Sequence, residues 1–179
     1  MTSFMWTIFI FNIKINSMKL TMIYRMMLMT VLLLISGILM AQEMKILTWE
    51  AYKTKFSIPG NLRVIKSSGD YWSGTNDTIN ISIKAFRDEK LTKQEKSDLL
   101  YNWAINNGMK NIGNVIKLDS SQFNGFCGIM YEGANAGFPV ITAHLSYPND
   151  ESVNFYIWIS YREDSKDIAL KTLMSFIPN

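Results

Sequence analysis

Two runs of alternating residues near the C-terminus, 138–147 and 153–161, constrain the fold more than any other part of the chain. The turn formers of 148–152 separate these runs, so together they predict an antiparallel hairpin. One register places apolar or aromatic side chains opposite one another: Ile141 with Ile159, Ala143 with Ile157, Leu145 with Phe155, and Tyr147 with Val153. A shift of one residue would put these side chains opposite polar ones, so the pattern itself fixes the pairing.

A helix is predicted over residues 92–107. Thr92 and Glu95 have the spacing of a capping box, in which each side chain accepts a hydrogen bond from the other residue's backbone amide. The apolar stripe that follows consists of Leu99, Leu100, Trp103 and Ala104. Gly108 is placed to end the helix in the left-handed conformation.

The rest of the chain after residue 42 reads mainly as strands. Alternation over 79–85 predicts a half-buried strand, and shorter strands are expected at 56–60, 62–65, 114–118 and 126–132. A final helix buries one face and stops near Pro178; its apolar residues are Ile168, Ala169, Leu173 and Phe176. Residues 42–179 are therefore expected to form a single α+β domain, with a mainly antiparallel sheet flanked by helices.

The N-terminal segment has the pattern of a secretory signal. Lys19 and Arg25 precede an uncharged apolar run from Met26 to Met40, and Ala41 follows it. We expect residues 18–41 to be a signal peptide cleaved after Ala41 or Gln42, and residues 1–17 to be an over-extended N-terminus. The run is short for a membrane span, which needs about 20 apolar residues. Leu39 is larger than the usual small residue before a cleavage site, so an uncleaved membrane anchor is the alternative.

Charge outside this segment is balanced. Three of the chain's 18 basic residues lie before residue 42 and no acidic residue does, which leaves 15 basic against 15 acidic residues. A neutral domain without a cluster of cations does not have the composition of a nucleic-acid-binding surface, so no nucleic-acid partner is expected.

An extracytoplasmic location, periplasmic or secreted, follows from the signal peptide.

Cys127 and His144 are the chain's only cysteine and histidine. One cysteine excludes an intramolecular disulfide and cysteine-rich zinc sites, and one histidine supplies too few ligands for a metal centre. Apolar neighbours predict that Cys127 lies in a buried strand as an inert thiol. No metal and no cofactor are expected.

The hairpin register also predicts one candidate binding surface. Thr142, His144 and Ser146 lie on its more polar face, and across the hairpin Thr142 is opposite Trp158 and His144 is opposite Tyr156. Such a surface could stack a sugar or peptide ring and hydrogen-bond it. The alternative, which the pattern favours, is that a helix covers this face and these residues pack.

A second candidate lies in Gly69-Asp70-Tyr71-Trp72-Ser73-Gly74. Read as a loop, this segment would present Tyr71 and Trp72 at a binding tip. The favoured alternative is a turn flanked by glycines, whose aromatic side chains fold back onto the sheet.

Several segments together resemble the Mog1/PsbP/DcrB-like group of domains. They are Trp49 with Lys55-Phe56-Ser57-Ile58-Pro59, the helix at 92–107, Gly125-Phe126-Cys127-Gly128, the closing hairpin, and the final helix with Ser175-Phe176. The resemblance covers most of residues 45–178 and implies an antiparallel sheet sandwiched between helices. Members of that group have different functions, so the resemblance does not assign one.

Two functions remain open at this stage. The first is a non-enzymatic binding or accessory module that contacts an envelope protein or a small ligand. The alternative is a small extracytoplasmic hydrolase centred on His144. A dimer formed through the aromatic face is a third arrangement that the composition does not distinguish.

Overall fold

The computed structural model describes residues 43–87, 91–121, 123–146 and 153–178. Contacts divide the chain after Gln42, and all described residues belong to the unit Glu43–Asn179. The predicted signal peptide, its cleavage site and the segment 1–17 lie outside the described residues. No helix in the described residues is long and apolar enough to span a membrane.

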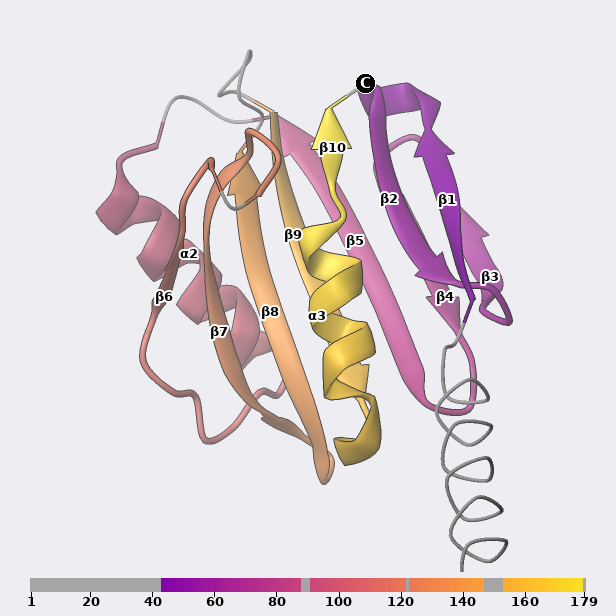
Figure 1. The fold of residues 1–179 in the computed structure, drawn as a ribbon. Coiled ribbons are helices and arrows are strands. Elements are labelled where there is room, and N and C mark those ends of the chain that lie inside the picture. Colours follow the sequence, from indigo (N-terminus) through magenta and orange to yellow (C-terminus); the bar gives the residue numbers. More distant parts are fainter. Residues whose placement is uncertain (1–42, 88–90, 122, 147–152, 179) are drawn as a thin grey trace, which may run out of the picture. The chain divides into compact units, whose positions relative to one another are not determined.

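A seven-stranded antiparallel sheet forms the centre of the unit (Figure 1). Its strands, in spatial order, are β3 (Arg63–Ser67), β4 (Tyr71–Thr75), β5 (Ile79–Arg87), β9 (Val153–Tyr161), β8 (Phe138–Ser146), β7 (Cys127–Asn135) and β6 (Ile116–Leu118). The two strands of the predicted hairpin are neighbours, and β5 lies beside them in the middle of the sheet. The expected mainly antiparallel α+β architecture is confirmed.

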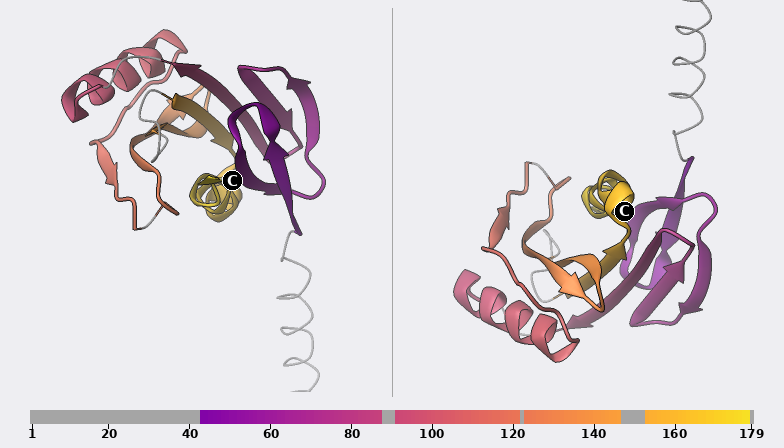
Figure 2. Two further views of the ribbon diagram at one scale, coloured as in Figure 1. Left: turned by 90° about the horizontal axis from the view of Figure 1, so that it is seen from above. Right: turned by 90° about the horizontal axis from the view of Figure 1, so that it is seen from below.

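A helix covers each face of this sheet (Figure 2). Helix α2 (Lys93–Asn106) contacts β7 and β8 on one face. On the other face, α3 (Lys166–Met174) packs on β9 and on a three-stranded sheet. That small sheet contains β1 (Met44–Trp49), β2 (Thr54–Pro59) and β10 (Ile177–Pro178), with a 3-10 turn at Glu50–Tyr52 between β1 and β2. A second 3-10 turn, Glu163–Ser165, leads into α3.

The hairpin register is the one that the sequence predicts. Ile141 pairs with Ile159, Ala143 with Ile157 and Leu145 with Phe155, and all six side chains are fully buried. The fourth predicted pair includes Tyr147, which lies outside the described residues. Alternation in β5 is also confirmed, because Ile79, Ile81, Ile83 and Ala85 are buried in the same core.

Helix α2 begins as predicted. The Thr92 side chain accepts from the Glu95 amide, and the Glu95 carboxylate accepts from the Thr92 amide at 2.7 Å. Gly108 follows the helix with φ +83°, in the left-handed region. Leu99 was predicted to belong to the buried stripe, which is wrong: its side chain is 39% exposed, whereas Leu100 and Ala104 are fully buried.

Other local predictions need correction. Residues 71–75 form strand β4, so the segment 69–74 is neither a loop nor a turn over its whole length, and only residues 68–70 connect β3 to β4. Strands β1 and β10 were not predicted: the alternation in β1 is weak, and β10 has only two residues and pairs with β2, which is far from it in the sequence. Phe176 lies beyond the end of α3, although it is buried as expected.

The C-terminal segment is held by aromatic packing. Phe176 is fully buried and stacks on Phe56 of β2, with ring centroids 4.9 Å apart and planes within 8°. Phe56 in turn contacts Trp72 edge-on at 5.1 Å. These rings join the small sheet, α3 and the large sheet in one core.

We predict that Phe176→Ala lowers the free energy of unfolding by about 3–5 kcal/mol, because the substitution leaves a cavity between the two sheets. Ile177→Ala is the matched control: Ile177 is 47% exposed, so its truncation should change stability by no more than about 0.5 kcal/mol. Urea denaturation followed by tryptophan fluorescence measures both. Equal losses in the two variants would contradict this account of the core.

Candidate functional site

The first predicted surface is covered. Thr142, His144 and Ser146 point to the face of the sheet under α2, and their exposed fractions are 0%, 0% and 2%. Their cross-strand partners are those that the sequence predicts, with Thr142 opposite Trp158 and His144 opposite Tyr156. The arrangement matches the packing alternative, because none of the three side chains is accessible to a ligand.

Hydrogen bonds between β8 and β9 pair most of the polar groups in this buried layer. The Oδ1 atom of Asn154 accepts from His144 Nε2 at 2.9 Å and from Ser146 Oγ at 3.1 Å. Thr142 Oγ1 donates to the Ile157 carbonyl at 3.0 Å. With Asn154 Oδ1 as the acceptor, His144 carries a proton on Nε2.

His144 Nδ1 is buried and has no hydrogen-bond partner among the described residues. Burial lowers the pKa of His144 below its ordinary value and the Lys96 ammonium lowers it further, whereas the bond to Asn154 and the nearby Lys96 backbone oppose the shift. Desolvation dominates because the charged imidazolium would lose its hydration under α2. His144 is therefore a neutral packing residue of the core.

The lowered pKa of His144 predicts an acid-sensitive fold. In the unfolded chain the histidine titrates near its ordinary pKa of 6.5. The folded state resists protonation of His144. The contribution of the neutral histidine to the free energy of unfolding is therefore fully present above about pH 6.5, and it declines as the pH falls toward the folded-state pKa. The measurement is the free energy of unfolding between about pH 7.5 and pH 5.

His144→Gln keeps a donor toward Asn154 and removes the titration. The decline in stability over that pH interval should be smaller in this variant than in the wild type. The same pH slope in both proteins would show that His144 does not carry the effect.

Three aromatic side chains fill the space beside this layer. Trp103 of α2 stacks on Tyr156 with centroids 5.0 Å apart and meets Trp158 edge-on at 5.7 Å. Tyr156 and Trp158 are only partly buried, unlike their polar neighbours on β8. The aromatic packing thus ends at the edge of the area of the sheet that α2 covers, and Trp158 lies at this edge.

A concave site opens where α2 ends, with a volume of ≈ 380 Å³. We call it the aromatic groove. It is lined by the aromatic residues Tyr71, Trp103, Phe138 and Trp158, the asparagines Asn80, Asn107 and Asn135, the serines Ser82 and Ser160, and Ala136. No acidic or basic side chain lines the aromatic groove. The groove brings together Tyr71 and Trp158, which belong to two different predicted surfaces.

Trp72, the other aromatic residue of the predicted tip, is not part of the groove. It is 1% exposed and packs against Phe56 in the core. Successive residues of a strand point to opposite faces, so Tyr71 and Trp72 separate as soon as the segment becomes β4. The exposed loop tip, the less favoured of the two alternatives, is wrong; Trp72 packs on the core as the favoured alternative expects, but from strand β4 and not from a turn.

Hydrogen bonds hold the groove's polar side chains in place. The Tyr71 hydroxyl donates to Ser82 Oγ at 3.1 Å. Asn135 Nδ2 donates to the Asn107 carbonyl at 2.8 Å, and Asn107 Nδ2 donates to the Trp103 carbonyl at 2.8 Å. The two asparagine side chains donate through their amide nitrogens, so the side-chain carbonyl oxygens of Asn107 and Asn135 remain as acceptors.

The sequence contains a signal for part of this groove. Asn80 and Ser82 alternate with the buried isoleucines of β5, so they were expected to point away from the core. The pairing of Ser82 with Trp158 across β5 and β9 was not visible, because it requires the order of strands in the sheet. Phe138 follows the β7–β8 turn at Ala136 and Gly137 and is 52% exposed.

Cys127 is the remaining sequence candidate, and its predicted burial is wrong. It is exposed at the start of β7 and lines a separate cavity of ≈ 360 Å³ near the first turns of α2. Its register partner is Ser146, whose hydroxyl is bonded to Asn154 and not to the thiol. Within the described residues, no three His, Cys, Asp or Glu side chains are grouped so that they could hold a metal ion.

No protein-family model matches the chain, and no curated protein matches it. Solved structures do match. The crystal structure of the Saccharomyces cerevisiae Ran-binding protein Mog1p aligns with a TM-score of 0.53 at 9% identity, over 77% of this chain and 96% of that chain. A mutant of the protein Mog1 aligns with a TM-score of 0.51 at 9% identity, over 76% and 96%. The chain thus has the Mog1/PsbP-like fold that its sequence resembles, and identity at this level shows the fold alone.

Proposed function

We propose that this domain of Mog1/PsbP-like fold is a non-enzymatic, extracytoplasmic binding module, and that its aromatic groove takes an uncharged polar ligand. One observation carries the proposal: partly exposed aromatic rings and fixed amide and hydroxyl groups converge in one concavity that no charged side chain lines. Apolar walls with a few placed polar groups are the usual composition of ligand sites.

Each part of the groove supplies one kind of contact. Phe138 and Trp158 offer ring surface for stacking, and Asn80 and Ser160 offer hydrogen-bonding groups beside them. A ligand that combines an apolar face with hydroxyl or amide groups would use both kinds. A phosphate or another anion would find no cation in the groove to balance its charge.

Lys66 contacts one of the residues that line the groove. Its Nζ lies 5.2 Å from the centroid of the Tyr71 ring, in a cation-π arrangement outside the lining of the groove. That contact occupies one side of the tyrosine ring. Phe138 and Trp158 are therefore the rings on which a ligand would stack.

Support for the alternative hydrolase is weak. His144 is fully buried, its Nε2 is bonded to Asn154, and it lines none of the three cavities described for this domain. A general base must come within hydrogen-bond reach of the proton that it abstracts. His144 would need α2 to move away before it could meet a substrate.

The extracytoplasmic location rests on the N-terminal sequence. Lys19 and Arg25, the apolar run to Met40, and Ala41 are in the order of a cleavable signal. We predict that the protein isolated from its native envelope fraction begins at Gln42 or Glu43, measured by intact mass and N-terminal sequencing. A measured mass that includes residues 18–41 would mean that the segment is not cleaved and that the module is anchored to the membrane.

Binding through the groove predicts that Phe138→Ala weakens the affinity for an uncharged ligand about tenfold or more, which is about 1.4 kcal/mol. Phe138 is 52% exposed, so its removal should leave the fold intact. The control is Tyr101→Ala, since Tyr101 is 43% exposed on α2 and lies outside the groove.

The ligands to test are neutral oligosaccharides and uncharged peptides, with phosphorylated sugars as the anionic comparison. Trp103 and Trp158 make tryptophan fluorescence the direct measurement. The proposal fails if no neutral ligand binds, or if Tyr101→Ala weakens binding as much as Phe138→Ala does.

A further inference from the structure

A second concavity adjoins the aromatic groove. We call it the turn cavity; its volume is ≈ 280 Å³, and it lies beside the β4–β5 turn and the end of β9. Asn80, Phe138 and Ser160 line both concavities. The exposed ring of Phe138 thus borders both concavities, and we call the two together the cleft.

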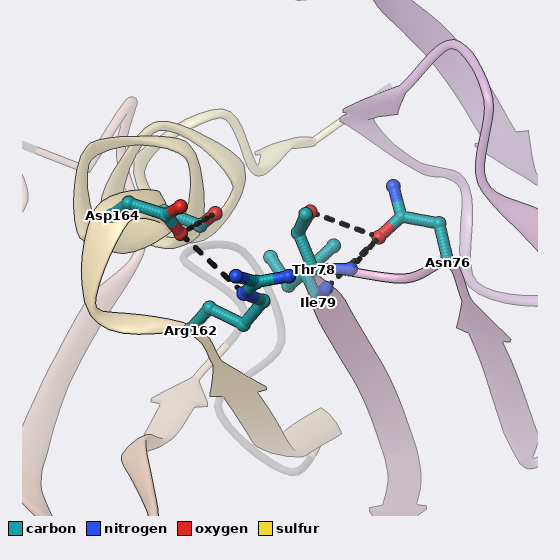
Figure 3. Close-up of polar contacts among 6 residues, drawn as sticks. Asn76, Thr78, Ile79, Arg162 and Asp164 are labelled. Carbon is teal, nitrogen blue, oxygen red and sulfur yellow. Dashed lines mark hydrogen bonds and ion pairs between the residues drawn. The ribbon is translucent and has the colours of Figure 1, made fainter.

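The wall of the turn cavity is preformed. Asn76 Oδ1 accepts from the Thr78 amide at 2.9 Å, from Thr78 Oγ1 at 3.1 Å and from the Ile79 amide at 2.9 Å (Figure 3). The Arg162 amide donates to the Thr78 carbonyl at 2.9 Å, which ties this turn to the end of β9. A turn held by four bonds loses little conformational entropy when a ligand binds.

Charges in the turn cavity offset one another. Arg162 and Asp77 both line it, and Arg162 Nε lies 3.9 Å from Asp164 Oδ1, where both side chains are more than half exposed (Figure 3). Such an exposed pair contributes little binding energy of its own. The cleft as a whole therefore favours a ligand without net charge.

The cleft lies over the interior of the sheet. Asn80 belongs to β5 and Ser160 to β9, and these strands pair with each other and have a further neighbour on their other sides. Their backbone groups are therefore engaged in the sheet. An extended peptide that binds by adding a strand needs a free edge, which this cleft does not offer. Recognition here must come from side chains.

We propose that the ligand of this cleft is an elongated neutral oligosaccharide, with sugar units on both sides of Phe138. The inference rests on the proposed function and names its ligand class. A sugar ring presents an apolar C–H face to an aromatic ring and hydroxyl pairs to asparagine and serine side chains, which are the groups that line the cleft. Each concavity is near the lower end of the volume of small-ligand pockets, about 300–1,000 Å³, so a chain of small units fits better than one bulky ligand.

The test compares chain lengths and two positions in the cleft. The probes are the disaccharide and the hexasaccharide of N-acetylglucosamine, of cellulose and of amylose, titrated into the purified protein by tryptophan fluorescence and calorimetry. For at least one series, the hexasaccharide should bind about tenfold or more tightly than the disaccharide.

Phe138→Ala should lower the affinity for both the disaccharide and the hexasaccharide of that series. Arg162→Ala should lower the affinity for the hexasaccharide alone, because only the longer chain reaches the turn cavity. Arg63→Ala is the matched control, since Arg63 is exposed on β3 and lines neither concavity. Circular dichroism checks that each variant is folded.

The outcomes separate this inference from the proposed function. Equal affinities for the two chain lengths, or no binding of any of these sugars, overturn the inference. If uncharged peptides bind and Phe138→Ala abolishes that binding, the groove is still a ligand site and only its ligand class is wrong. If Phe138→Ala changes the binding of no ligand, the proposed function fails as well.

Discussion

The pairing of β8 with β9 is the interaction on which the rest of the structure depends. Its register places Ile141, Ala143 and Leu145 against Ile159, Ile157 and Phe155 on one face, where the small sheet and α3 close the core. The same register collects the polar and aromatic side chains on the other face. A slip by one residue would exchange the two faces, so the core and the groove are consequences of one pairing.

The width of a helix explains why part of the second face stays open. An α-helix is about 10 Å across and strands are about 4.8 Å apart, so one helix covers roughly two strands. Helix α2 packs on β7 and β8 and buries His144 there. The same face of β4, β5 and β9 extends beyond the helix, and Tyr71, Ser82 and Trp158 line the aromatic groove at this border. The groove is the uncovered part of a wide sheet.

This division also separates the roles of the polar residues. Under the helix, Ser146 and His144 satisfy the Asn154 oxygen, and burial holds the histidine neutral. A buried polar layer of this kind helps to specify a unique packing when its bonds are complete, although His144 Nδ1 lacks a described partner. Beyond the helix, similar residue types meet solvent. The residue type therefore does not decide whether a side chain is buried; its position relative to α2 does.

The sequence by itself determined the features that arise from neighbours along the chain. Alternation in β5, β8 and β9, the hairpin register and the capping box of Thr92 and Glu95 are set by short-range periodicity and local hydrogen bonds, and the structure has them. Tertiary structure decided which of two equivalent faces is covered. Tyr71 and Trp72 are adjacent in the chain, yet one lines the groove and the other is in the core, because strand order determines what lies above each face. The groove itself joins β4, β5, α2, β7, β8 and β9, and only the folding of the sheet brings these segments together.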